Sequence, residues 1–168
     1  SEKLRLLETS EVLETSEVCF IRKSVLEEIK TVIDTSISAI ETPCVLLDKA
    51  RLQNNIQRIQ EIANAHHVKV RPHIKTHKCL EILRLQLDAG AVGMTAAKTD
   101  EALTFIHKGI QSVTVAYPLV IDSKLERLIA VSRSRHVDLR LIVDSFAGME
   151  AISRVAKRHE QKVNVFLK

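Results

Sequence analysis

The sequence lacks several features that mark particular classes of protein. Tryptophan is absent and aromatic residues make up only 3% of the 168 residues, so aliphatic side chains must fill any interior. No apolar run reaches the ~18 residues that a membrane-spanning helix needs. No basic stretch followed by a long apolar one marks a secretory signal. These absences predict a cytoplasmic protein without a membrane partner.

Cysteine and charge point to no special partner either. Cys19, Cys44 and Cys79 share no metal-like spacing, and we expect them to be reduced. No metal site is predicted in this chain. The formal net charge of +4 is mild and spread along the sequence, which predicts no nucleic-acid partner but suits a basic pocket for a phosphate.

Residues 1–40 are predicted to form an extension, followed by one domain at 41–168. The hexapeptide LETSEV occurs at 7–12 and again at 13–18, which is too short a repeat for a solenoid and predicts a flexible or loosely helical tail. Apolar residues at helical spacing predict a helix over 24–40, which Pro43 ends.

Beyond Pro43 the apolar pattern predicts strands and helices in regular alternation. A short apolar run at 44–47 leads to Asp48, which is predicted to cap a helix ending near residue 65. Strands are then predicted at 68–74, 91–96, 112–117, 138–144 and 163–167, and helices at 79–89, 99–109, 122–134 and 146–158.

This alternation predicts an α/β protein with about five parallel strands and four intervening helices. Both a doubly wound sheet and a (β/α)8 barrel satisfy the pattern, and the strand count by itself slightly favours the open sheet. No G-x-G-x-x-G follows the first predicted strand, which argues against the commonest dinucleotide-binding version.

The stretch RPHIKTHK at 71–78 carries the strongest chemical signal. Strand periodicity places Arg71, His73 and Lys75 on one side, where burial is costly unless a phosphate or carboxylate binds. Neighbouring cations lower the pKa of a lysine and leave more free amine to attack an aldehyde. The alternative interpretation is a solvated basic strand end.

Together with ETPCVLLD at 41–48 and LQLDAGAVGMTAA at 85–97, this stretch resembles the D-serine dehydratase-like / D-threonine aldolase family. These are fold-type III pyridoxal-phosphate (PLP) enzymes, related to the alanine racemase N-terminal domain. The resemblance implies a partial TIM-like (β/α)8 barrel in which Lys75 is catalytic and forms the imine with PLP. It makes His73, Arg71 and Thr76 cofactor-binding candidates and His77 a substrate-side candidate. Tyr117 ends the strand predicted at 112–117, where side chains would face the barrel mouth, and is another substrate-side candidate; the alternative is a packed or rim tyrosine.

The resemblance further implies a PLP-dependent lyase acting on a small D-β-hydroxy amino acid, as a dehydratase or an aldolase, with racemisation as a third option. The family's phosphate-binding loops and its site for a divalent metal (zinc or manganese) have no counterpart here, so the chain is predicted to be truncated. The full-length form is expected to be a homodimer. The competing hypothesis is a non-catalytic half-barrel that binds PLP weakly or only self-associates.

Overall fold

The computed structural model describes residues 18–21 and 45–168. The chain forms two compact units, Ser1–Ile62 and Ala63–Lys168. The domain boundary predicted near residue 40 and the helix predicted at 24–40 lie outside the described residues. So does the hexapeptide repeat, apart from Val18.

The first unit contains a short pair of parallel strands. β1 (Val18–Ile21) pairs with β2 (Val45–Asp48), which takes up most of the predicted apolar run. The sequence pattern does not predict β1. Asp48 caps the next helix, α2 (Lys49–Ala65), as predicted, because its Oδ1 accepts the N–H of Arg51 at 2.9 Å.

The second unit is built on a parallel sheet of four strands, in the order β3-β4-β5-β6. Its strands are β3 (Met94–Ala96), β4 (Ser112–Val115), β5 (Asp138–Val143) and β6 (Asn164–Leu167). Its helices are α3 (Leu80–Asp88), α4 (Thr99–His107), α5 (Asp122–Ser134) and α6 (Phe146–Arg158). From residue 79 onward the predicted helices and strands are therefore confirmed, with ends that shift by a few residues.

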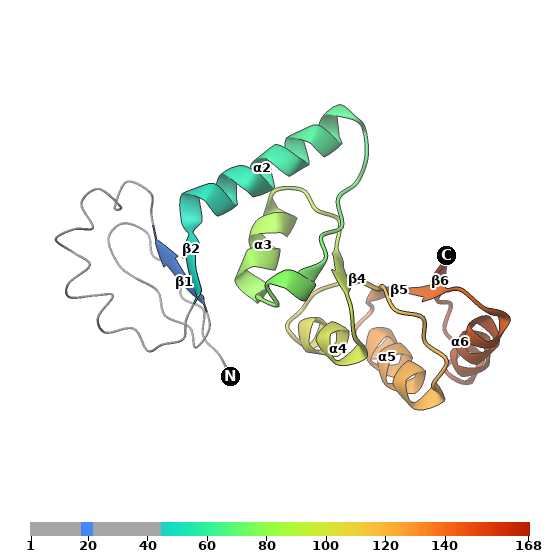
Figure 1. Ribbon diagram of the computed structural model, residues 1–168. Helices are drawn as coiled ribbons and strands as arrows, with labels where there is room; N and C mark the ends of the chain where they lie inside the picture. Colours follow the sequence, from blue (N-terminus) through green and yellow to red (C-terminus); the bar gives the residue numbers. More distant parts are fainter. Residues whose placement is uncertain (1–17, 22–44) are drawn as a thin grey trace. The chain divides into compact units, whose positions relative to one another are not determined.

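The order of the strands separates the two architectures that the sequence pattern left open. Each strand lies beside the one before it in sequence, and α4, α5 and α6 all lie on one side of the sheet (Figure 1). A doubly wound sheet reverses its strand order and carries helices on both faces, whereas a barrel adds strands in one direction inside a layer of helices. The second unit is a partial (β/α)8 barrel.

The hydrophobic core lies between the sheet and these helices. Along β5, Leu139, Leu141 and Val143 are buried, while the alternate residues are only half-buried. The largest fully buried side chains are all aliphatic or methionine, as the scarcity of aromatic residues predicts: Ile74, Leu83, Met94, Ile106, Leu125, Leu128, Ile129, Leu141, Val113, Val115 and Val155. Each such burial contributes roughly 1.5–3 kcal/mol of transfer free energy.

The strand predicted at 68–74 does not form, and this prediction is wrong. The segment runs beside β3 with two backbone hydrogen bonds, from Val92 N–H to the Val70 carbonyl (2.9 Å) and from Thr95 N–H to the Pro72 carbonyl (2.7 Å). Only the pair His73↔Thr95 forms a regular bridge. Proline has no N–H to donate to the ladder, and the chain then turns into the 3-10 helix η1 (Ile74–Thr76). A first barrel strand is thus reduced to a single bridged position.

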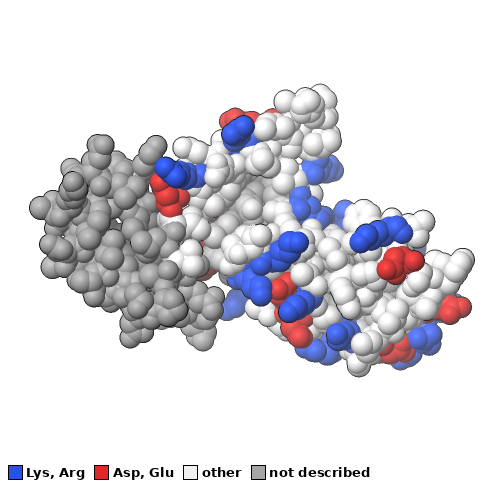
Figure 2. Space-filling model, in the orientation of Figure 1, with Lys and Arg blue, Asp and Glu red and all other residues white. Residues whose placement is uncertain are grey.

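The outer surface carries charges of both signs. Figure 2 shows Lys and Arg side chains interspersed with Asp and Glu on the face that it presents. Some of these charges pair between α5 and α6, where Asp122 accepts hydrogen bonds of 2.7 Å from both Arg154 and Arg158. Within the described part of the chain, none of the helices combines the length and the apolar character that a bilayer crossing requires.

Candidate active site

Lys75 lies at the end of the sheet where parallel (β/α) folds place their active sites. His73 pairs with Thr95, so in the parallel register Lys75 falls just beyond Ala96, the last residue of β3. Ile74 is fully buried and anchors the turn, while Lys75 and Thr76 are exposed. The carboxyl ends of the strands carry catalytic groups in barrel enzymes. The structure therefore places Lys75 at the carboxyl end of the sheet.

Two histidines hold the backbone of this turn. His73 Nδ1 accepts the N–H of Lys75 at 3.2 Å, and His77 Nδ1 accepts the N–H of Cys79 at 3.1 Å. Burial lowers the pKa of His73, and the positive charge of Lys75 lowers it further, against an opposing effect of Glu101. Burial also lowers the pKa of His77. Both imidazoles are therefore favoured in the neutral form that can accept a hydrogen bond.

The two lysines of the motif differ in their contacts. Lys78 Nζ lies 3.5 Å from Glu101 Oε1, and the other oxygen of Glu101 accepts the N–H of Ala97 at 3.0 Å. The amine of Lys75 makes no hydrogen bond or ion pair with any described residue. The ion pair holds the amine of Lys78 beside Glu101, whereas no described residue ties the amine of Lys75 in place. This contrast favours Lys75 over Lys78.

Arg71 does not join Lys75. Its Nη2 donates to Ser112 Oγ at 2.9 Å, and Ser112 Oγ donates to Asp138 Oδ2 at 2.8 Å. Ser112 and Asp138 are the first residues of β4 and β5, so this network lies at the amino ends of the strands. The predicted row of Arg71, His73 and Lys75 is thus not formed, because η1 interrupts the strand alternation. A role for Arg71 in binding PLP stays a prediction.

The network around Asp138 was missed by sequence reasoning. Arg140 Nε and Asn164 Nδ2 also donate to the Asp138 carboxylate, at 3.0 and 3.1 Å. Burial alone would raise the pKa of Asp138, but the hydrogen bonds from Arg140, Ser112 and Asn164 outweigh it and lower the pKa. The signal in the sequence is the polar residue that opens each of the strands β4, β5 and β6.

Arg71 reaches Ser112 only because Gly93 leaves room. A Cβ at Gly93 would collide with the Arg71 guanidinium and would lie 2.6 Å from the Ser112 carbonyl oxygen. Burial lowers the pKa of Arg71, and Arg140 lowers it further, against the opposing effect of Asp138. The guanidinium is therefore held in a crowded interior position, with its Nη1 buried and unpaired among the described residues.

Tyr117 lies two residues after the end of β4 and is 55% exposed. It therefore lies past the carboxyl end of that strand, at the same end of the sheet as Lys75 and Thr76. No described residue fixes its hydroxyl by a hydrogen bond. Its predicted role on the substrate side stays a prediction, as do those of Thr76 and His77.

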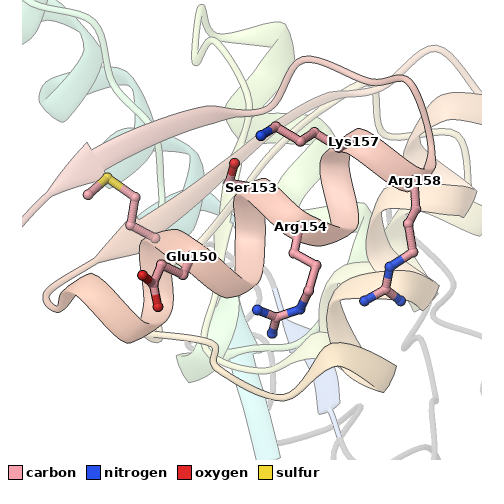
Figure 3. Close-up of a pocket in the computed structure, with 6 residues that line it drawn as sticks. Glu150, Ser153, Arg154, Lys157 and Arg158 are labelled. Atoms are coloured by element: carbon pink, nitrogen blue, oxygen red, sulfur yellow. The ribbon is translucent and has the colours of Figure 1, made fainter.

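A pocket on the second unit lies apart from the predicted site residues. It is lined by Met149, Glu150, Ser153, Arg154, Lys157 and Arg158, all from α6 (Figure 3). None of the predicted site residues lines it, and two of its arginines are bound to Asp122. Among residues 18–21 and 45–168, no group of three or more His, Cys, Asp or Glu side chains could hold a metal ion.

Comparison with known proteins gives consistent likenesses. Residues 47–168 match the family described as alanine racemase, N-terminal domain. The chain is 31% identical over 131 residues to a D-threonine aldolase of Arthrobacter sp, covering 78% of this chain and 34% of that protein. It is 42% identical over 144 residues to a D-serine dehydratase of Dictyostelium discoideum, covering 79% and 35%.

Solved structures agree with these relatives. D-threo-3-hydroxyaspartate dehydratase from Delftia sp. HT23 superposes with a TM-score of 0.71 at 32% identity, covering 77% of this chain and 34% of that chain. This chain therefore spans about a third of the length of the relatives that it matches.

Proposed function

Because this chain belongs to the alanine racemase N-terminal domain family, we propose that it is the lysine-bearing part of a PLP-dependent lyase for a small D-β-hydroxy amino acid. The names of its relatives support this class, since they include a D-threonine aldolase, a D-serine dehydratase and a hydroxyaspartate dehydratase. The observation that carries the proposal is the exposed amine of Lys75 at the carboxyl end of the sheet, which no described residue pairs with.

The residues present fit PLP at this position. An exposed primary amine without a carboxylate partner suits attack on the cofactor aldehyde, and Lys75 meets both conditions, whereas Lys78 is paired with Glu101. The exposed hydroxyl of Thr76 lies next to it in the chain and can donate to an anionic group. When bound, PLP supplies an electron sink that stabilises negative charge on the substrate.

In this proposal the protein groups have separate tasks. Lys75 would hold the cofactor, and its Nζ would accept a proton from the substrate and later return it. His73 and His77, kept neutral by burial, orient the turn rather than add charge beside the amine. Tyr117, which lies after β4, is exposed and available to the substrate; β4 is separated from the segment that carries Lys75 by β3.

Dehydratase, aldolase and racemase activities all remain within the proposal, because they share the cofactor and differ in the bond that breaks. The divalent metal, zinc or manganese, is assigned no ligand here, since the described residues offer no group for it. A homodimer and a cytoplasmic location stay predictions.

The second candidate function is a non-catalytic half-barrel that binds PLP weakly or only self-associates. The observation in its favour is β6, whose residues are all exposed, including Phe166 at 47% and Leu167 at 88%. A parallel strand whose outer edge and apolar side chains are uncovered can pair with another chain. Size-exclusion chromatography with and without PLP distinguishes self-association from cofactor binding.

The proposal is tested by trapping the lysine. The full chain is incubated with PLP, reduced with borohydride and mapped by peptide mass spectrometry. We expect the pyridoxyl group on Lys75, its loss in Lys75→Arg, and its retention in the matched control Lys78→Arg. A label on Lys78 with Lys75 unmodified would overturn the assignment, and an unlabelled chain that only associates would favour the second candidate.

A further inference from the structure

The turn that carries Lys75 has little backbone support of its own. η1 is three residues long, and its internal hydrogen bonds run from His77 N–H (3.2 Å) and Lys78 N–H (2.7 Å) to the Ile74 carbonyl. The preceding segment is joined to β3 at a single bridge. A short 3-10 turn of this kind holds its geometry poorly unless side chains satisfy its remaining N–H groups.

Two imidazoles accept backbone N–H groups with the same spacing, one within η1 and one where the chain leaves it to enter α3. His73 accepts the N–H of Lys75, two residues on, and His77 accepts the N–H of Cys79, again two residues on. This contact is the imidazole counterpart of the Asx turn, in which a side-chain oxygen accepts the N–H two residues later. One of the two contacts involves the peptide N–H of Lys75 itself.

These contacts determine where each ring carries its proton. A ring nitrogen that accepts a hydrogen bond has no proton, so a neutral imidazole bonded through Nδ1 carries its proton on Nε2. Protonation of the ring would turn Nδ1 into a donor and remove the contact. The charged groups that act on His73 are Lys75, which opposes protonation, and Glu101, which favours it. Burial lowers the pKa of His77, against an opposing effect of a hydrogen bond with the Cys79 backbone, and its Nε2 is buried without a partner among the described residues.

We infer that His73 and His77 are positioning residues that hold the Lys75 turn as backbone acceptors through Nδ1, each ring in the tautomer protonated on Nε2. The inference rests on the proposed function for the purpose of the turn, since Lys75 is there the cofactor lysine. It differs from the sequence-based prediction, which places His73 on the cofactor and His77 on the substrate.

The first test needs no cofactor and no substitution. Nitrogen-15 NMR of the histidine side chains in the full chain, at neutral pH, reports which ring nitrogen is protonated. We expect an unprotonated Nδ1 on His73 and His77, against tautomer mixtures on the exposed His66 and His107. A protonated Nδ1 on either of the two rings in the turn would overturn the inference for that residue.

The second test uses a matched pair of substitutions. The side-chain oxygen of Asn reaches about the position of Nδ1, whereas that of Gln reaches toward Nε2. In His77→Gln we expect amide hydrogen exchange at Cys79 to be about tenfold faster, which corresponds to ~1.4 kcal/mol, and in His77→Asn to stay near the native rate. His73→Gln and His73→Asn should behave in the same way at Lys75. Equal exchange in the Asn and Gln variants would contradict the inference.

The PLP label provides a separate readout. Labelling of Lys75 should slow in His77→Gln and recover in His77→Asn, while far-UV circular dichroism verifies that both variants fold. If the native chain shows the expected tautomers and exchange but no label on Lys75, the proposed function fails and the inference about the turn stands. If the native chain is labelled and the Asn and Gln variants behave alike, the inference about the histidines fails alone.

Discussion

Replacing Gly93 with alanine tests the crowded contact between Arg71 and the amino ends of the strands. Gly93 is buried and has a φ of +150°, in the region where an L-residue is strained. A Cβ there would meet the Arg71 guanidinium, and it would lie 2.6 Å from the Ser112 carbonyl oxygen and 2.8 Å from the Ser112 Cβ. The carbonyl cannot move away freely, because β4 is paired with β3 at the next residue.

The expected loss of stability follows from the backbone strain and the overpacking. The backbone strain costs roughly 1–3 kcal/mol, and overpacking against a backbone atom costs typically 1–3 kcal/mol. The loss of glycine's freedom in the unfolded chain returns about 0.4–1 kcal/mol. We therefore expect Gly93→Ala to lower the free energy of unfolding by about 1–5 kcal/mol, a large part of the ~5–15 kcal/mol typical of a domain.

Gly109→Ala is the matched control. Gly109 also has a positive φ, +94°, but a Cβ there would have no heavy atom within 4 Å. Only the strain applies, so we expect a loss of about 0–2.5 kcal/mol after the gain from the unfolded state, smaller than that of Gly93→Ala by the overpacking cost. Urea unfolding of the full chain, followed by far-UV circular dichroism, measures both. Equal destabilisation by the two substitutions would refute the packing that the structure shows around Arg71.

Two further predictions concern charged groups. Arg71→Met keeps most of the apolar stem but removes the hydrogen bond to Ser112. A hydrogen bond to a charged group typically contributes ~1.5–3 kcal/mol. We expect the free energy of unfolding in urea to fall by only about 1–2 kcal/mol, because the substitution also removes Nη1, which is buried and unpaired among the described residues. An unchanged stability would mean that the network does not anchor this segment. Hydrogen bonds from Arg154 and then Arg158 lower the pKa of Asp122 to about 2. The stabilisation from the ionised Asp122 is therefore fully present above the unfolded pKa of about 3.9. This stabilisation is lost as the pH falls from about 4 to about 2. Asp122→Asn should therefore lose less stability than the native protein between pH 5 and pH 2.5 (roughly the ends of that window), as measured by urea midpoints, and an identical loss in both would contradict the pairing.

The regular part of the fold could be predicted because its signals are local. The helices at Asp122–Ser134 and Phe146–Arg158 begin and end where their apolar periodicity does. A helical face or an alternating strand is written within a few turns of sequence, so no distant contact is needed to recognise it. The prediction of a site at Lys75 also rests on a local signal, since this residue lies in a short motif of unusual composition.

Tertiary structure decided what depends on residues far apart in the chain. The partners of Arg71 could not be read from its motif, because Ser112 is 41 residues away and comes near only when β3 and β4 pair. The distinction between Lys75 and Lys78 likewise depends on Glu101, which α4 brings to one amine and not to the other. The sequence by itself determined the alternation of elements and the motif that contains Lys75. Which side chains meet across the sheet followed only from strand order and register, because these bring together residues that have no local relation in the chain.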